Sequence, residues 1–383
     1  DEMVFNAKEF TKQGINVPVL IGGATTSKMH TAAKIAPCYK NNQIVHVLDA
    51  SRAVVVVSSL LDSKGNLEYV QDIKDEYEEL RAKYYEGLVD KVYYPLAKAR
   101  QRKLRVDWTL AAITKPRAMG VTYFRDYDLA QLVDYISWDP FFHTWQMRGK
   151  YPNRGYPKIF NDKACGEQAR ELFDKAQAML AKIVDDKLLT ARAAIAFYPC
   201  NTVGDDIELY DEADGKTVIA KLFTLRQQQE TENGVYLALS DYVAPKDSGL
   251  TDYIGMFACS AGFGQDELIK QFEGDHDDFS IIMLKALADR LAEALAEKLH
   301  EDVRKDYWGY SPDEDLSKKE LVYVKYRGIR PAPGYPSQPD HTEKKTMWTL
   351  MNVADEVGIE LTENLAMEPA SSVSGLYFAH PAA

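Results

Sequence analysis

Two short apolar segments near the start of the chain place the strongest limit on what it can fold into. Residues 17–21 and 44–48 are too short for amphipathic helices, and Ser27 and Ser51, which follow them, are residues that cap helix N-termini well. Strands that alternate with helices at this spacing predict a parallel sheet in a Rossmann-like α/β arrangement. Two strands are too few for a complete sheet, so we expect the rest of this domain to lie upstream of residue 1.

The remaining residues predict a connector and a larger domain. Between residues 63 and 118, apolar residues recur every three or four positions from Leu67 to Leu88, which predicts a helix that ends or kinks at Pro95. Beyond residue 119, strands are expected at 193–197, 207–210, 218–223 and 236–239, and long helices at 165–184 and 280–305. This pattern favours an α+β fold with a mainly antiparallel sheet. We therefore predict domains at residues 1–62, 63–118 and 119–383.

Charge and cysteine usage narrow the function classes. With a formal net charge of -12, the chain is a poor candidate for binding duplex nucleic acid, which needs clustered Lys and Arg. Its four cysteines form no CxxC pair and indicate neither a zinc site nor a disulfide framework. No apolar run reaches the ~18 residues of a membrane span. We expect a cytoplasmic protein that binds neither nucleic acid nor membrane.

Two segments have the composition of ligand-binding loops. Residues 21–27 place two glycines after a predicted strand, where a ligand can approach the backbone and a helix N-terminus offers donors. Residues 328–336 hold three prolines and two glycines, which fix an extended loop. In that loop, Arg330 can bind a carboxylate with a bidentate fork, and Tyr335 can pack against a ring or a cationic sulfur. Either segment is also consistent with a structural turn that binds nothing.

Two further features are candidates for a site. The helix predicted at 280–305 carries charged residues at four-residue spacing: Lys285, Asp289, Glu293, Glu297 and Glu301. A solvated stripe is the ordinary explanation, and the alternative is that Asp289 and Glu293 line a groove for a positively charged ligand. Tyr377 lies in an apolar run that fits a strand entering the core, from which its hydroxyl could reach a site. The sequence contains no catalytic triad, P-loop or metal-ligand spacing, and nothing in it identifies a nucleophile.

Several motifs accompany the proline-rich loop in a fixed order. Together with Arg-Pro-Ala-Pro-Gly-Tyr-Pro at 330–336, they resemble the reactivation domain of the cobalamin-dependent methionine synthase family. They are Val-Gly-Asp-Asp-Ile at 203–207, Leu-Arg-Gln-Gln at 225–228, Asp-His-Thr-Glu-Lys at 340–344, and residues 285–293, 361–363 and 373–375. Residues 21–27 and 50–52 resemble the end of the preceding cobalamin-binding domain. Each motif is modest alone, but together they are specific and cover nearly the whole chain outside the connector.

The resemblance implies a function that spacing alone does not give. The family transfers a methyl group from methyltetrahydrofolate to homocysteine through cobalamin, whose cobalt is occasionally oxidised and inactivated. The reactivation domain then brings S-adenosylmethionine to the cobalt, while flavodoxin or a flavoprotein reductase supplies an electron. The resemblance thus implies S-adenosylmethionine and cobalamin as cofactors. It implies flavodoxin or a reductase, and the cobalamin domain of the same chain, as partners, with zinc only in a homocysteine domain outside this chain.

The resemblance also assigns binding roles at matching positions. Arg330 would hold the ligand carboxylate, the backbone at Ala332 and Gly334 would meet the adenosyl part, and Tyr335 and Tyr377 would border the pocket. Asp289 and Glu293 are expected at a groove or interface. The residues that match cobalamin contacts are Gly22, Gly23, Ala24, Thr25 and Ser51. None of these residues needs a proton-transfer role, so no catalytic side chain and no metal ligand is assigned.

The sequence departs from the family pattern at its site and its ends. Ser137 stands where the family often has a ligand-contacting Asp, and Asp139, two residues later, is the candidate replacement. The Asp-x-His-x-x-Gly segment that supplies the histidine ligand of cobalt is absent, so we expect it upstream, and the family usually continues beyond Ala383. We therefore do not expect this chain alone to bind cobalamin in the usual way or to turn over homocysteine.

Two alternatives stay open at this stage. The chain could be a binding-only fragment that holds S-adenosylmethionine and docks the electron donor without catalysing anything itself. It could also be an unrelated nucleotide-binding α/β protein, although the absence of P-loop and Rossmann fingerprints argues against that. The basic residues Arg100, Arg102 and Lys103 in the connector are either a solvated surface or a site that attracts an acidic flavodoxin.

Overall fold

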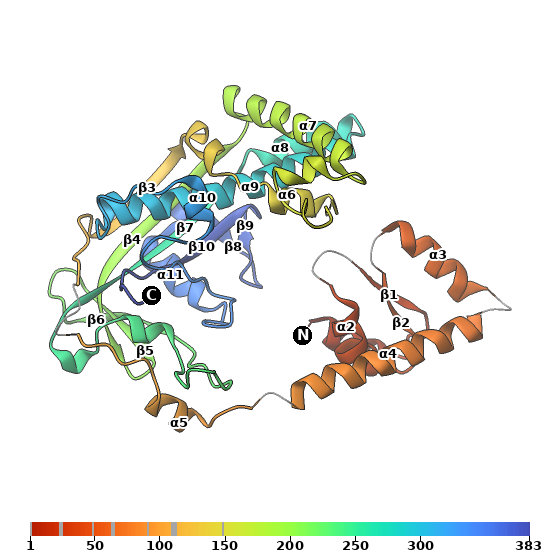
Figure 1. The fold of residues 1–383 in the computed structure, drawn as a ribbon, viewed down its shortest axis with the longest axis horizontal. Helices are drawn as coiled ribbons and strands as arrows, with labels where there is room; N and C mark the ends of the chain where they lie inside the picture. The colour runs from red at the N-terminus through yellow and green to blue at the C-terminus, as the bar shows by residue number, and fades with distance from the viewer. Residues whose placement is uncertain are drawn as a thin grey trace. The chain divides into compact units, whose positions relative to one another are not determined.

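The chain folds into two compact units, Asp1–Tyr94 and Pro95–Ala383, each with its own sheet (Figure 1). The computed structural model describes residues 2–22, 26–47, 50–62, 66–89, 92–108, 113–147 and 149–383. Among these residues, no helix is long and apolar enough to cross a membrane.

The first unit is built on two parallel strands. β1 (Val19–Gly22) and β2 (Ile44–Val47) pair in register, with Val19 opposite Ile44 and Gly22 opposite Val47. The helical segments are α1 (Glu2–Lys12), α2 (Lys28–His30), a π turn (Thr31–Ile35), a 3-10 turn (Ala36–Cys38), α3 (Ala50–Leu61) and α4 (Asn66–Val89). The predicted alternation of strand and helix is confirmed.

Helix α4 packs on the first unit through the apolar face that the sequence predicted. Ile73 and Tyr77 share a core cluster with residues of β2 and α3. The hydroxyl of Tyr77 accepts a hydrogen bond of 2.7 Å from the N–H of His46. The helix expected in a separate connector therefore belongs physically to the first unit. The break between units falls after Tyr94, and the predicted divisions after residues 62 and 118 do not coincide with it.

The second unit is organised around a six-stranded antiparallel sheet. Its strands run in the order β10 (Ser372–Tyr377), β7 (Asp252–Phe263), β4 (Thr190–Val203), β5 (Asp206–Tyr210) and β6 (Val218–Phe223), and β3 (Gly120–Tyr127) also pairs with β4. β3 pairs along residues 191–197 of β4 and β5 along residues 200–203, so these two strands share one edge of β4. The α+β fold predicted from the sequence, with a mainly antiparallel sheet and long helices, is confirmed.

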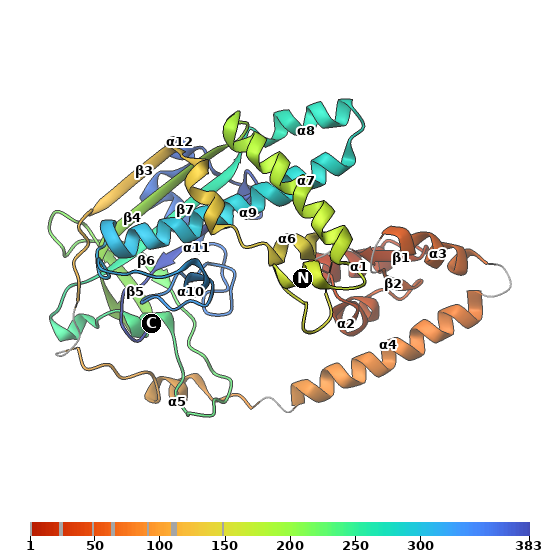
Figure 2. The same ribbon diagram turned by 45° about the horizontal axis from the view of Figure 1, so that its top comes forward.

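Helices cover both faces of this sheet. One face packs against α9 (Asp278–Asp302), which in turn packs against α6 (Asp139–Thr144) and α7 (Gly166–Asp185), as Figure 2 shows. The other face packs against α11 (Glu343–Met351) and α12 (Val353–Val357). Alternate residues of β4 divide between the layers: Ile195 lies in the α9 cluster, and Ala194 and Ala196 lie in the α11 cluster.

Shorter segments complete the second unit. They are α5 (Leu96–Gln101), the 3-10 turns Leu129–Tyr135, Lys158–Asn161, Leu239–Tyr242 and Lys246–Ser248, α8 (Gln265–Gly274), the π turn Val303–Tyr307, α10 (Lys318–Val322), β8 (Glu360–Leu361) and β9 (Met367–Glu368). The strand predicted at residues 236–239 is wrong. Tyr236 is buried by loop contacts instead, because its N–H donates to the carbonyl of Arg102 at 3.1 Å and its carbonyl accepts from Arg226 at 2.8 Å.

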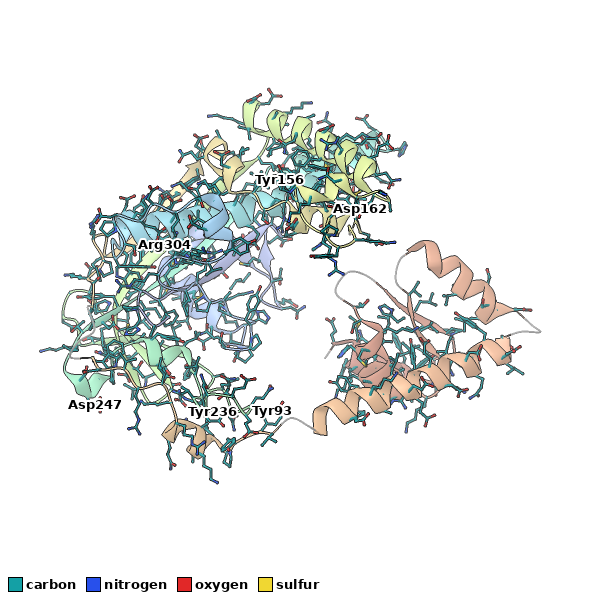
Figure 3. All side chains as sticks on the ribbon, in the orientation of Figure 1. Tyr93, Tyr156, Asp162, Tyr236, Asp247 and Arg304 are labelled. Carbon is teal, nitrogen blue, oxygen red and sulfur yellow. The ribbon has the colours of Figure 1, made fainter. Side chains whose placement is uncertain are left out.

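Arg226 is the centre of a buried ion cluster that joins motifs far apart in the sequence. Its side chain is fully buried and donates to Asp205 at 2.6 and 3.0 Å and to Asp241 at 2.8 Å. Arg100, from α5, donates to the same Asp205 at 2.7 Å, although its own side chain is 54% exposed. Tyr236, labelled in Figure 3, supplies the carbonyl acceptor. Arg226 is thus surrounded by two carboxylates and a carbonyl, as a buried guanidinium requires.

We predict that Arg226→Met destabilises the second unit by about 3–5 kcal/mol, because it leaves the buried carboxylate of Asp241 without its counter-ion and leaves Asp205 with only the exposed Arg100. Arg100→Gln is the matched control: it removes the exposed partner of Asp205 and should cost less than about 1 kcal/mol. Urea unfolding followed by tryptophan fluorescence measures both, since all five tryptophans lie in the second unit. Equal losses in the two variants would contradict this account of the cluster.

Candidate functional site

The proline-rich loop is held against β10 by backbone pairing. Ile329 and Phe378 exchange two N–H···O=C hydrogen bonds of 3.1 Å. The N–H of Leu376 donates to the carbonyl of Pro331 at 2.8 Å. The loop therefore begins as an extension of the sheet edge, which fixes the backbone of Arg330 between these contacts.

Two glycines permit the tight course of the loop. Gly328 has φ 86°, and a Cβ there would lie 2.5 Å from the carbonyl oxygen of Phe378 and 2.6 Å from the hydroxyl of Tyr310. Gly334 has φ 103°, and a Cβ there would lie 2.4 Å from the ring of His341. The exposed ring of His341 can move aside, whereas the backbone pairing of Phe378 and the burial of Tyr310 fix the neighbours of Gly328.

Arg330 reaches from the loop to the last turns of α9. Its Nη2 donates to Glu297 Oε2 at 2.6 Å, and its Nη1 donates to the Tyr326 hydroxyl at 2.7 Å and to His300 Nδ1 at 3.2 Å. Burial opposes the charge, but Glu297 and Tyr326 raise the pKa of Arg330 above its ordinary value. The side chain is 25% exposed. A fixed and partly exposed guanidinium can receive an anionic group of a ligand.

Tyr377 lies in the core behind Arg330. Its side chain is fully buried, and its ring stacks on Phe257 at 4.8 Å and on His300 at 5.1 Å. Burial raises the pKa of the Tyr377 hydroxyl well above its ordinary value. In this structure Tyr377 supports the imidazole ring that contacts Arg330. Its expected contact with a ligand stays a prediction.

Tyr335 and the tip of the loop lie at the surface. The side chain of Tyr335 is 65% exposed, Gly334 is exposed and Ala332 is half-buried. An exposed aromatic ring on the same loop as a fixed cation is available to pack against a ligand ring. These three residues lie on the same loop as Arg330, and their contact with a ligand stays a prediction.

Asp139 is held in a different local contact. It begins α6, and its Oδ1 accepts a hydrogen bond of 2.5 Å from the N–H of Tyr156, which Figure 3 labels next to α7. No contact within the described residues joins Asp139 to Arg330. The proposed replacement of the family Asp by Asp139 stays a prediction.

The acidic stripe of α9 leads to Arg330. Asp289 accepts a hydrogen bond of 2.7 Å from the hydroxyl of Ser371, and Glu293 is exposed one turn further along the helix. Glu297 follows on the same face at the next four-residue step and contacts Arg330. The stripe and the loop are thus connected through Glu297.

Comparison with known proteins identifies the family. Residues 128–383 match the family model described as the activation domain of vitamin B12 dependent methionine synthase. The chain belongs to this family. This chain is also similar to a crystal structure of the MetH reactivation domain bound to AdoHcy. The two share 46% sequence identity and superpose with a TM-score of 0.72, over 76% of this chain and 88% of that chain. The part matched as a methionine synthase activation domain contains the whole Arg330 site.

The predicted cobalamin contacts lie outside the residues that match the activation-domain model. Gly22 ends β1, and a Cβ there would lie 2.9 Å from the carbonyl oxygen of Val47, so the close approach of the two strands accounts for this glycine. Outside the described residues lie Gly23, Ala24 and Thr25, and also the side chain of Ser51. These contacts stay predictions. The described part of the chain contains no cluster of His, Cys, Asp or Glu that could hold a metal ion.

Three residues that hold Arg330 were missed as site residues: Glu297, His300 and Tyr326. Glu297 had a signal, because it belongs to the four-residue stripe of the predicted helix. No sequence signal pointed to His300 or Tyr326, because each contacts Arg330 only through the packing of α9 against the segment before the loop.

We predict that Gly328→Ala destabilises the second unit by about 3 kcal/mol, because the left-handed backbone costs about 1–2 kcal/mol and overpacking against a fixed carbonyl adds about 1–3. Gly334→Ala is the matched control and should cost only the backbone term, about 1–2 kcal/mol. The midpoints of urea unfolding give both values. An equal or larger loss for Gly334→Ala would show that His341 is as immobile as the neighbours of Gly328.

Proposed function

We propose that this chain binds S-adenosylmethionine at the Arg330 site and supports the reductive methylation of inactive, oxidised cobalamin to methylcobalamin within a methionine synthase. The observation that carries the proposal is the 46% identity to a MetH reactivation domain that binds AdoHcy. AdoHcy shares the amino-acid and adenosyl parts of S-adenosylmethionine and lacks only the methyl group with its positive charge. Contacts that hold the first ligand therefore also suit the second.

The loop and α9 offer a contact for each part of such a ligand. Arg330 would take the carboxylate, because its described contacts leave further N–H groups of the guanidinium for a ligand. The backbone at Ala332 and Gly334 would meet the adenosyl part, and the exposed ring of Tyr335 would cover it. The proline-fixed loop has little freedom to lose on binding, which favours affinity. The acidic face of α9, with Glu293 exposed, suits a positively charged sulfur.

The residues of this site bind and orient the methyl donor and need no proton-transfer role. The positive sulfur already activates the methyl group, so the protein contributes mainly proximity and orientation. Cobalamin, when bound, supplies the reduced cobalt that accepts the methyl group. The chain's own part is to present the sulfonium with its carboxylate fixed at Arg330.

We predict that Arg330→Ala weakens S-adenosylmethionine binding by roughly 10- to 100-fold, the loss expected when a charge-assisted hydrogen bond to a carboxylate is removed. Arg330→Lys keeps the charge without the fork and should recover only part of the affinity. Titration calorimetry measures the dissociation constants, and thermal unfolding checks that each variant is folded. Wild-type affinity in Arg330→Ala would remove Arg330 from the site.

A second experiment separates the two functional alternatives. The chain is incubated with S-adenosylmethionine, free cobalamin and a low-potential electron donor, and the absorption spectrum of methylcobalamin is followed. Methylcobalamin formation above the rate without protein supports a reactivating role for this chain. Binding of S-adenosylmethionine without methylation supports the binding-only alternative.

We also propose that flavodoxin or a flavoprotein reductase docks on the basic segment around α5. Lys98 and Lys103 are exposed there, and Arg100 anchors the segment to the second unit through Asp205. Such a cluster in a chain of net charge -12 forms a local positive patch that attracts an acidic partner.

We predict that the double variant Lys98→Glu/Lys103→Glu weakens flavodoxin binding by roughly 10-fold or more at low salt and flattens its salt dependence, because long-range attraction is lost. The matched control is Lys182→Glu/Lys187→Glu, which reverses two exposed lysines at the end of α7. Surface plasmon resonance between about 20 and 300 mM salt measures both effects, as screening varies most over this range. The same response in both double variants would mean that net charge, and not this segment, governs docking.

A further inference from the structure

His300 contacts Arg330 from the last turn of α9. Its Nδ1 lies 3.2 Å from Arg330 Nη1. A guanidinium can only donate, so Nδ1 must be the unprotonated acceptor and the ring proton must lie on Nε2. Nε2 in turn lies 3.5 Å from the hydroxyl of Tyr310. The contact therefore requires a neutral ring in one tautomer.

Packing fixes the orientation of the His300 ring. The side chain is fully buried, and the ring stacks on Tyr377 at 5.1 Å with an angle of 19° between the planes. Tyr326 meets the same ring edge-on at 4.9 Å. Tyr377 is itself stacked on Phe257 of β7. The direction in which Nδ1 points is thus set by the central sheet.

Charged groups around the His300 ring favour its neutral form. Arg304, labelled in Figure 3, lies in the π turn after α9 and pairs with Glu314 at 2.7 Å, and Arg330 pairs with Glu297 at 2.6 Å. Burial, and then the positive charges of Arg304 and Arg330, lower the pKa of His300 well below its ordinary value. The ring is therefore available as an acceptor at neutral pH.

We propose that His300 is a positioning residue that holds Arg330 so that the site selects the carboxylate at the amino-acid end of its ligand. His300 and Tyr326 hold Nη1, and Glu297 holds Nη2, so both arms of the fork are fixed. An arginine side chain that must be ordered on binding loses rotamer entropy, which weakens binding. The three acceptors remove that cost before the ligand arrives. The inference rests on the proposed binding of S-adenosylmethionine at Arg330.

The test compares S-adenosylmethionine with decarboxylated S-adenosylmethionine, which lacks only the carboxylate. The ratio of their dissociation constants measures carboxylate selectivity and cancels any general loss of affinity. For the wild type we expect a preference of roughly 10-fold or more, and for Arg330→Ala a ratio of about one. His300→Leu should reduce the wild-type ratio by roughly 3- to 10-fold and leave binding of the decarboxylated ligand within about twofold.

Two neutral amides give a matched pair at the same position. His300→Asn places a carbonyl oxygen near the position of Nδ1 and should restore most of the wild-type ratio. His300→Gln places its oxygen near the position of Nε2 and should behave like His300→Leu. This pair decides the question even if the leucine variant fails to fold, and thermal unfolding identifies the folded variants. In the wild type, nitrogen NMR of the imidazole should show a proton on Nε2, and a proton on Nδ1 would overturn the inference.

The outcomes separate the inference from the function on which it rests. A wild-type ratio in His300→Leu, or an equal loss for both ligands, overturns the positioning role, because a merely structural residue would act on both ligands alike. A ratio near one in the wild type, or an unchanged ratio in Arg330→Ala, refutes Arg330 as the carboxylate anchor and the inference with it.

Discussion

The long antiparallel pairing of β4 with β7 is the constraint on which the rest of the second unit depends. Both strands are buried along most of their length, so a slip by one residue would move each apolar set into the wrong layer. β7 holds β10 on its other edge, with Tyr377 opposite Gly255. Because Phe378, just beyond β10, pairs with Ile329, the register of the sheet also places Arg330 against α9.

Three of the ion-paired arginines in this unit, Arg226, Arg304 and Arg330, show how burial distinguishes a charge that serves the fold from one that a ligand could reach. The side chains of Arg226 and Arg304 are fully buried, and each is held by carboxylates in a bidentate manner. Removing either partner there leaves an uncompensated charge, so these residues serve the fold. Arg330 is 25% exposed and shares its contacts among one carboxylate, one hydroxyl and one neutral imidazole. Of these three arginines, Arg330 alone combines a fixed cation with access for a ligand.

The periodicity of apolar residues predicted the amphipathic helices correctly. It missed strands whose formation depends on pairing with segments far away in the sequence. The helices predicted at 165–184 and 280–305 match α7 and, in large part, α9. A helix that buries one face has apolar residues every three or four positions, and this spacing is visible in the sequence. β7 left no comparable signal, since residues such as Gly255 and Ala258 fit any buried segment and its pairing partners lie far away in the sequence. The residues of the candidate site also fall into these two groups, those recognisable from the sequence and those that depend on packing. The loop around Arg330 is recognisable from its prolines and its family resemblance, whereas His300 becomes part of the site only through packing.

The pairing of Arg330 with Glu297 also limits which ligands the site can favour. Glu297 already neutralises the guanidinium, so a simple carboxylate would bring a second anion to a single cation. A ligand that carries its own positive charge offsets that anion, and the acidic face of α9 with Asp289 and Glu293 adds to the effect. A sulfonium amino acid has this combination: a carboxylate for the fixed fork and a cation beside it. The charges around Arg330 therefore suit a zwitterionic or cationic amino-acid ligand better than a bare anion, which supports the proposed ligand independently of any contact with the adenosyl part.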